Sequence, residues 1–308
     1  MRGVGGLRAL VLCAALAAGP LSAKAEECTN PDALGVARTV EIDTQGGPWL
    51  GTPHGNPSLL QPGEVVLTFD DGPVPSTTRP ILEALAAECT KATFFMVGQM
   101  AKAYPQMVRE VVAHGHTVGT HTWSHPNLAG LTPERMREQI EAAFATVEKA
   151  AGTPIAPFFR YPYLSSTRTS VSYLKDRGIA QIAIDIDSFD YLTRKPPTVV
   201  RRVMSSLQAK GRGIILMHDI HASTARAVPM LLQRLKAKGI KIVHLRPKAP
   251  VQIIEVAVAA ASKARATPDR RHRHVTAQAK GHARTEAHTR AEAGGQNGFL
   301  VPFPWSTE

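Results

Sequence analysis

Cysteine is scarce in this sequence, with three residues among 308, at positions 13, 28 and 89. Cys13 follows Leu12 inside an N-terminal apolar run, where a lipoprotein signal would need a small residue, so we expect no lipidation. Cys28 and Cys89 do not have the spacing of zinc ligands, which excludes a cysteine-based zinc site. In an exported protein these two residues can form a disulfide, and the sequence leaves a disulfide and two free thiols as open alternatives.

Long hydrophobic runs are also missing. The N-terminal run ALVLCAALAAGPL is too short to span a bilayer comfortably, and no later segment is apolar enough for a transmembrane helix. Arg2 and Arg8 lie at or before the start of this run, and the small residues of the segment AKA at 23–25 follow it. These features predict a signal peptide over residues 1–25 and export to the periplasm or out of the cell.

Acidic residues are outnumbered, with 25 Asp and Glu against 36 Lys and Arg, so the formal net charge is +11. This balance favours anionic partners in general, such as acidic glycans, membranes or nucleic acid. Because export is expected, we predict no nucleic-acid partner and retain anionic envelope polymers. A hydrophobic content of 44% and a charged content of 20% are ordinary for a folded soluble protein.

From residue 65 onward, segments typical of strands alternate with segments typical of helices. We expect strands at 65–69, 91–98, 116–121, 179–188, 212–219 and 240–245, and one that ends in 157–163, with helices between them. One of these helices follows residue 98 and runs through about 114, and another has Thr132 as its cap and Pro133 as its first residue. Such alternation implies parallel strands joined by right-handed crossovers. The expected fold class is α/β, and about seven β/α units fit a barrel better than an open sheet.

The two ends of the chain lack this pattern. Residues 26–62 carry Gly, Pro and Asn and predict an irregular lead-in. Residues 63–247 contain the alternating segments and form one expected domain. Residues 248–308 lose the apolar period and are rich in Arg, Lys and His, which predicts a basic and mostly disordered tail.

Polar side chains stand where the expected strands end, the position at which barrel enzymes collect their reactive groups. The first strand runs directly into Asp70 and Asp71, two neighbouring carboxylates that repel each other when both are ionised. The segment DDGP taken alone is equally typical of a simple turn. Similar residues follow four other strands: His121 and His125; Arg160 and Tyr163; Asp187 and Asp190; and His218.

A metal would explain the paired carboxylates. His121 and His125 are four residues apart, a spacing that lets adjacent helical turns present both imidazoles to one ion. Two histidines and one carboxylate leave positions open for water and substrate, and Asp71 is the expected third ligand. Asp70 then remains free to take a proton from the attacking water, while the cation neutralises its neighbour.

The segments TFDDG, HTWSH, RYPY, DSFDY and LMH, in this order, resemble the motifs of the polysaccharide deacetylases of carbohydrate esterase family four, which share the NodB homology domain. The resemblance covers about residues 63 to 247, which it makes the catalytic domain, and excludes the lead-in and the tail. It implies a distorted (β/α) barrel. It also implies hydrolysis of N-acetyl groups from a glycan containing N-acetylglucosamine, such as chitooligosaccharide, exopolysaccharide or peptidoglycan, with release of acetate.

The resemblance also implies a role for each residue that matches a motif. The metal ligands are Asp71, His121 and His125, and the metal is usually zinc, with cobalt or nickel as alternatives. Asp70 is the general base and Arg160 orients it. His218 is the general acid that protonates the leaving amine, and Asp190 holds it.

Three further residues are implied in substrate binding. The backbone N–H of Tyr163 helps to hold the oxyanion, and Leu216 lines the pocket for the acetyl methyl group. Tyr191 stands where the family usually has Trp, which changes the pocket wall and bears on substrate preference.

Two alternatives to a polysaccharide N-deacetylase stay open. The same metal site would serve an O-acetyl esterase or a small-molecule amidase. A non-catalytic polysaccharide-binding protein would instead use its basic tail to hold anionic polymer. The complete set of polar residues at the strand ends favours an enzyme over a binding protein.

Overall fold

The computed structural model describes residues 28–53 and 59–253. They lie within the first of two compact units, Met1–Thr267, and the second unit, Pro268–Glu308, falls outside the described residues. The predicted signal peptide and most of the predicted basic tail also lie outside them. No helix among the described residues is long and apolar enough to cross a membrane.

The described residues form one ten-stranded sheet in which every ladder is parallel. Its strands are β1 (Arg38–Ile42), β2 (Trp49–Leu50), β3 (Glu64–Asp70), β4 (Thr93–Met96), β5 (Thr117–Thr120), β6 (Phe158–Phe159), β7 (Ala180–Ile182), β8 (Ile186–Asp187), β9 (Gly213–His218) and β10 (Lys241–Pro247). β3 is central: it pairs with β9 over six positions, from Val65 opposite Gly213 to Asp70 opposite His218, and with β4 and β10.

The sheet curls towards a barrel without closing. Along the hydrogen-bonded order, β7 lies beyond β6 at one side and β8 lies beyond β9 at the other. Only residues 183–185 separate β7 from β8 in the chain, so these two distant positions of the sheet must come near each other in space. The predicted α/β class is confirmed, and this curled sheet is compatible with the distorted barrel that was expected.

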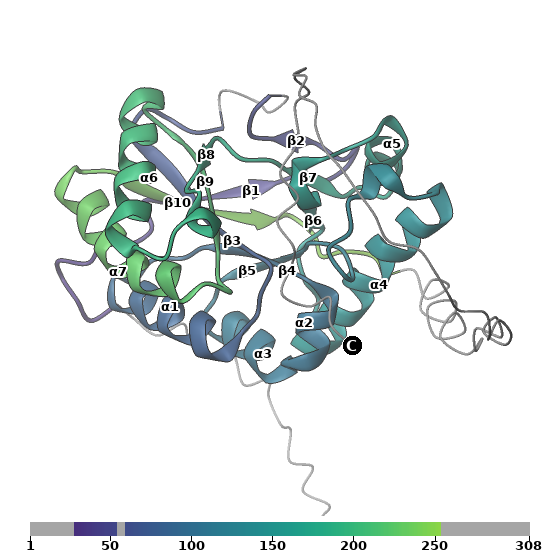
Figure 1. The fold of residues 1–308 in the computed structure, drawn as a ribbon, viewed down its shortest axis with the longest axis horizontal. Helices are drawn as coiled ribbons and strands as arrows, with labels where there is room; N and C mark the ends of the chain where they lie inside the picture. Colours follow the sequence, from purple (N-terminus) through teal and green to yellow (C-terminus); the bar gives the residue numbers. More distant parts are fainter. Residues whose placement is uncertain (1–27, 54–58, 254–308) are drawn as a thin grey trace, which may run out of the picture. The chain divides into compact units, whose positions relative to one another are not determined.

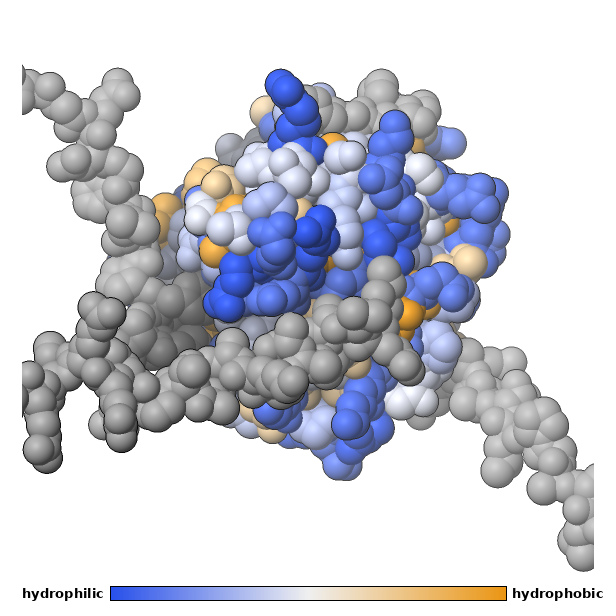
Figure 2. Space-filling view, turned by 90° about the vertical axis from the view of Figure 1, so that its right-hand side faces the viewer, coloured by the Kyte–Doolittle hydropathy of each residue, from blue (hydrophilic) through white to orange (hydrophobic). Residues whose placement is uncertain are grey.

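In the part of the chain that the structure describes, seven helices are present. They lie around the sheet (Figure 1). They are α1 (Pro75–Ala87), α2 (Gly98–Ala103), α3 (Pro105–Ala113), α4 (Pro133–Ala151), α5 (Arg168–Asp176), α6 (Pro196–Lys210) and α7 (Ala222–Ala237), with 3-10 turns η1 (Leu128–Gly130), η2 (Pro162–Leu164) and η3 (Asp190–Leu192). α4 begins as predicted, because the Thr132 side chain accepts from Arg135 N and Pro133 is the first helical residue. The face that includes α4 and α5 is mainly hydrophilic (Figure 2), as expected for helices with one buried side.

Alternation along the strands explains which side chains reach the interior. Val65, Leu67 and Phe69 of β3 belong to the apolar cluster that the helices cover, whereas Val66 belongs to a second cluster inside the curled sheet. Because side chains alternate along a strand, Thr68 and Asp70 share the inward direction of Val66.

β9 follows the same rule. Ile214 belongs to the interior cluster, and Ile215 and Met217 to the cluster under the helices. Leu216 and His218 therefore point inward, towards the same side as the end of β3.

Three expectations about the elements were wrong. The single helix expected before residue 114 is two helices, because Pro105 starts α3 and cannot continue α2. The strand expected at 179–188 is β7 and β8, which pair with different neighbours. The lead-in is not wholly irregular, because β1 pairs with β10 and β2 with β7. β1 carries two charged residues among its five and β2 has only two residues, so neither has a clear signal in the sequence.

The lead-in is also bonded covalently to the turn that follows α1. Cys28 and Cys89 form a disulfide with their Cα atoms 5.6 Å apart, which decides between the two alternatives left open by the sequence. The Glu88 side chain accepts from Leu34 N, and its carbonyl accepts from Gly35 N. The start of the lead-in is therefore fixed to the end of α1.

The boundary expected at residue 247 is not sharp. Lys248 N donates to the carbonyl of Ile42, and Val251 N donates to the carbonyl of Ile155. Val251 is buried. The first residues of the predicted tail, up to 253, thus pack on the domain.

Candidate active site

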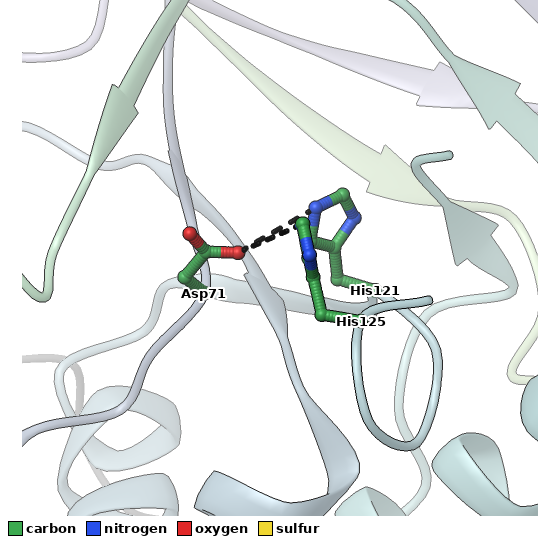
Figure 3. Close-up of side chains that lie close together, drawn as sticks. All are labelled: Asp71, His121 and His125. Atoms are coloured by element: carbon green, nitrogen blue, oxygen red, sulfur yellow. Dashed lines mark ion pairs between the residues drawn. The ribbon is translucent and has the colours of Figure 1, made fainter. Parts of the chain in front are cut away.

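Asp71, His121 and His125 converge beyond the ends of β3 and β5 (Figure 3). Asp71 Oδ1 lies 3.4 Å from His125 Nε2 and 3.7 Å from His121 Nε2. One ligand atom from each residue lies within 4.8 Å of the other two, and no other such group of three was found among the described residues. The structure therefore brings together the three predicted metal ligands.

Hydrogen bonding fixes the tautomer of His121. Its Nδ1 lies 2.7 Å from the backbone carbonyl of Arg160, which can only accept, so Nδ1 carries the proton. Burial lowers the pKa of His121 to about 3, so the ring is neutral at physiological pH and its Nε2 has a free lone pair. Burial and the neighbouring His121 lower the pKa of His125 to about 3 as well.

Asp71 fits a cation between these rings. Its Oδ1 is buried and accepts no hydrogen bond from the described residues. Burial raises the pKa of Asp71 to about 7, because the charge of His218 offsets only part of the loss of hydration. The lone pair on Nε2 of neutral His121 also repels the Asp71 carboxylate oxygen that it faces. A divalent cation between them would offset both the burial of the carboxylate and this repulsion. One oxygen and two imidazole nitrogens suit zinc, cobalt or nickel.

The turn after β3 aims Asp71 away from its neighbour. Asp71 has a φ of 78°, a left-handed conformation that non-glycine residues seldom adopt. The next residue, Gly72, donates its N–H to Asp219, which also accepts from the Thr78 hydroxyl. A Cβ on Gly72 would lie 2.1 Å from an Asp219 oxygen, so only glycine fits here.

His121 and His125 come together through a loop, so the expectation that adjacent helical turns present them was wrong. β5 ends at Thr120, and His125 lies before η1 in irregular chain. Thr122 and His125 have φ values of 67° and 58°, and His125 N donates to the Thr122 hydroxyl. This tight loop places the two imidazole centroids 4.8 Å apart.

Asp70 is held by a fully buried arginine. Arg160 Nη1 donates to Asp70 Oδ1 at 2.7 Å and to the Thr68 hydroxyl at 2.8 Å. The rest of the guanidinium donates to the carbonyls of Ile182 and Ala183. Burial raises the pKa of Asp70, and the charge of Arg160 opposes this rise. The expected pairing is present, but burial outweighs the arginine.

His218 forms a comparable pair with Asp190. His218 Nδ1 lies 2.7 Å from Asp190 Oδ1, and the Thr224 hydroxyl donates to Asp190 Oδ2. Burial alone would lower the pKa of His218, but Asp190, with the further carboxylates Asp71 and Asp70, raises it to about 10. Burial opposes ionisation of Asp190, yet His218 and these hydrogen bonds lower its pKa to about 2. The pair is thus an imidazolium and a carboxylate at neutral pH.

The remaining predicted residues lie around these groups. The Tyr163 ring, 60% exposed, stands 4.8 Å from that of His125, and the Tyr191 ring, 45% exposed, stands 5.5 Å from that of His218. Leu216 is buried on the inward face of β9. The structure therefore brings every predicted site residue to one end of the sheet.

Several supporting contacts escaped the sequence analysis. The Thr68 hydroxyl accepts from Arg160, and the Thr224 hydroxyl donates to Asp190. Of these two, only Thr68 could have been found from the sequence, because it lies two residues before Asp70 on the same face of the strand. Asp187, by contrast, was among the polar residues noted at the strand ends; it accepts from the N–H of Phe189 and the hydroxyl of Tyr191, and it braces this loop.

The comparisons with known proteins agree with this geometry. The polysaccharide deacetylase family model matches residues 60–182. A chitooligosaccharide deacetylase of Azorhizobium caulinodans is 32% identical over 155 residues, covering 50% of this chain and 73% of that protein. The peptidoglycan-N-acetylmuramic acid deacetylase PdaC of Bacillus subtilis is 34% identical over 180 residues, 58% of this chain but only 37% of PdaC. The chain thus spans little more than a third of that relative's length.

Solved structures show the same relationship. A peptidoglycan deacetylase of Bdellovibrio bacteriovorus superposes with a TM-score of 0.60 at 30% identity, covering 69% of this chain and 59% of the other. A pseudoenzyme of the same family from Bacillus anthracis superposes with a TM-score of 0.56 at 27% identity, covering 61% and 65%. The chain belongs to the polysaccharide deacetylase family.

Proposed function

We propose that the protein is a metal-dependent hydrolase that removes N-acetyl groups from N-acetylglucosamine residues of a polysaccharide or oligosaccharide. The observation that carries this proposal is the convergence of three possible metal-ligand atoms beside two ion pairs. One pair contains the candidate base Asp70, and the other contains the candidate acid His218. The names of the relatives, which include chitooligosaccharide and peptidoglycan deacetylases, support this class of substrate.

Asp71, His121 and His125 would hold the metal, with zinc as the first choice and cobalt or nickel as alternatives. A divalent cation held there supplies a Lewis acid that polarises the acetamide carbonyl. Tyr163 would offer its backbone N–H to the developing oxyanion. The left-handed φ of 56° at Tyr163 turns the chain sharply next to His125, which supports this role.

Asp70 would act as the general base. It takes the proton of the water that attacks the acetyl carbon, and its burial strengthens it as a base by raising its pKa. Arg160 is a positioning residue, because its contacts fix the guanidinium on both the Asp70 carboxylate and the neighbouring strands.

His218 would act as the general acid. The C–N bond breaks as the protonated imidazole gives its proton to the leaving nitrogen, so the products are acetate and an amine. Asp190 accepts a hydrogen bond from Nδ1–H, which leaves Nε2–H as the proton donor to the substrate. The His218 side chain keeps 14% exposure, so it can reach a substrate that enters the site.

Leu216 and Tyr191 would contact the substrate, Leu216 beside the acetyl methyl group. Tyr191 has its hydroxyl bound to Asp187, so its ring is held in place beside His218. Tyrosine at this position is smaller than the tryptophan that the family usually has, which gives more room next to the general acid.

We also propose that the protein works in the periplasm or outside the cell. The disulfide between Cys28 and Cys89 supports an oxidising compartment, and several relatives are named as peptidoglycan deacetylases. In this proposal residues 1–25 are the export signal, residues 63–247 the catalytic domain and residues 248–308 a basic tail available to anionic envelope polymers.

Acetate release with controlled metal content tests the function. The purified chain is treated with a chelator and then supplied with zinc, cobalt or nickel, with N-acetylglucosamine oligomers, peptidoglycan or an O-acetylated glycan as substrate. We expect acetate from an N-acetylated glycan only after metal is restored. Release from the O-acetylated glycan alone would make the protein an esterase. No release from any substrate by metal-loaded protein would favour a non-catalytic polysaccharide-binding protein.

A further inference from the structure

A cationic pocket adjoins the proposed general acid. It is a shallow hollow of about 370 Å³ beside α6, lined by Phe189, Arg201, Arg202, Ser205 and Ser206. No carboxylate lines it. Its two guanidinium groups and two hydroxyls can bind a polar ligand, and its one aromatic ring can pack against the flat side of a sugar. None of them belongs to the metal group or to the two ion pairs of the reaction centre.

The pocket connects to the reaction centre through a row of aromatic rings. The Tyr191 ring lies 5.5 Å from that of His218, and the Phe189 ring lies 6.0 Å from that of Tyr191. Arg202 places its guanidinium 5.8 Å above Phe189. Phe189 and Tyr191 are 41% and 45% exposed, so this row is open to a ligand.

The geometry of the row is fixed. Phe189 has a left-handed φ of 48°, its N–H donates to Asp187, and its carbonyl accepts from Arg202 Nη1 at 2.7 Å. Aromatic rings held in this way present a flat apolar face, which suits the apolar face of a sugar.

The charged residues that line the pocket, Arg201 and Arg202, have one sign. Neither forms an ion pair with a carboxylate among the described residues. The carboxylate of Asp187 lies in the loop of Phe189, but it already accepts from the Phe189 N–H and the Tyr191 hydroxyl. The exposed Arg201 donates only a 3.4 Å hydrogen bond to Thr198, so most of its donors are available.

We propose that this pocket binds a carboxylate carried by the glycan, close to the acetamide that is cleaved. A guanidinium fork matches a carboxylate with two parallel hydrogen bonds, and the hydroxyls of Ser205 and Ser206 can add further donors. The inference rests on the proposed function and narrows it: the substrate is an acidic N-acetylglucosamine glycan and not a neutral one. The acid is carried either on the sugar itself, as in a uronic acid, or on an ether substituent, as in muramic acid.

Binding to matched oligosaccharides tests the proposal without turnover. The full chain is titrated calorimetrically, with chelator present, against a neutral N-acetylglucosamine tetramer and two acidic tetrasaccharides. One acidic probe alternates N-acetylglucosamine with glucuronic acid, and the other alternates it with N-acetylmuramic acid. We expect at least one acidic probe to bind roughly fivefold more tightly than the neutral tetramer at low salt, with the advantage shrinking as salt is added.

Variants of α6 assign the effect to the pocket. Arg201→Gln should remove most of the acidic advantage, and Arg201→Lys should keep part of it. Lys210→Gln is the matched control, because it removes one charge from the same helix about 13 Å further along. Equal affinity for acidic and neutral probes, or an equal loss in Lys210→Gln, would overturn the proposal.

The same protein distinguishes failure of this inference from failure of the proposed function. Acetate release from the neutral tetramer, with no preference for acidic probes, would keep the deacetylase and refute the carboxylate pocket. Preferential binding of an acidic probe that depends on Arg201, without acetate release from any glycan, would support the pocket and contradict the deacetylase.

Discussion

At the scale of single residues, the backbone conformation points the neighbouring carboxylates of Asp70 and Asp71 in different directions. Asp70 points inward from β3 and binds Arg160, whereas the positive φ of Asp71 turns its carboxylate towards the two histidines. Each therefore has its own cationic or metal-binding environment. Asp70 still raises the pKa of Asp71, and a cation held by Asp71 and the histidines would offset this repulsion.

The pair of His218 and Asp190 gives a pH-dependent prediction. The pKa of His218 is raised to about 10 in the folded protein, above its unfolded value. The pair therefore contributes its full stabilisation below about pH 6.5, the pKa of an unfolded histidine, and this stabilisation is lost as pH rises through the folded pKa. In Asp190→Asn, we expect the alkaline limb of kcat/KM to move down by about one pH unit or more.

Matched pH profiles check this prediction. Thr224→Val, which removes only one hydrogen bond to Asp190, should shift the limb in the same direction by less. An unchanged alkaline limb in Asp190→Asn would show that another group is the acid.

Asp71 gives a prediction for the metal-free protein. Its carboxyl has a pKa of about 7, raised by burial, so the metal-free fold loses stability as pH rises from about 4 towards 7. Chelation should therefore lower Tm more at pH 8 than at pH 5. Asp71→Asn should remove this pH dependence and also abolish tight metal binding, both of which thermal melts and metal analysis would measure. A chelator effect that is equal at both pH values would contradict this account of Asp71.

At the scale of elements, the turn between β3 and α1 positions the metal ligand. Gly72→Ala would force a methyl group into the Asp219 carboxylate, 2.1 Å away, and displace Asp71 with it. We expect a loss of about 1–3 kcal/mol in the free energy of unfolding together with weaker metal binding.

A second glycine provides the control for this substitution. Gly130→Ala introduces a methyl group with no atom within 4 Å, so urea unfolding and metal titration should show little change. Equal effects of the two substitutions would show that the close approach at Gly72 is unimportant.

The sequence predicted elements better than it predicted loops. The apolar run before Asp70, the cap at Thr132 and the alternation of strands with helices were readable because each depends on local chemistry. The split between β7 and β8 was not, since it depends on which distant strand each one pairs with.

The candidate site was readable as a set of residue types and not as a geometry. Asp70 and His218 could be predicted because they stand at the ends of strands, and the other site residues could be predicted from the order of the motifs. The left-handed conformation at Phe189 left no local signal, because phenylalanine does not favour it. Histidine is enriched in this conformation but still adopts it seldom, so the sequence did not single out His125. The hydroxyl of Thr224, which arrives from α7, was equally hidden.

At the scale of the whole molecule, the disulfide closes a long loop. Cys28 and Cys89 are separated by 61 residues, so the bond should stabilise the fold by about 2–4 kcal/mol through the unfolded chain. In the double variant Cys28→Ser with Cys89→Ser, we expect this loss in urea unfolding and retained acetate release, because the bond lies at the end of α1, outside the contacts of the reactive groups.

Reduction of the unmodified protein is the companion experiment. It should reproduce the stability loss of the double variant, and it should have no effect on that variant. A reduced protein of unchanged stability would contradict a stabilising role for the bond.

In the proposed reaction, Asp70 and the metal group together hydrolyse an N-acetylated glycan. The most direct test measures acetate release by zinc-loaded protein and by Asp70→Asn, with zinc content determined for both. We predict bound zinc in both proteins, acetate from the first, and a loss of at least about a hundredfold in the second, because the base is missing. Equal acetate release by the two zinc-loaded proteins would contradict the account.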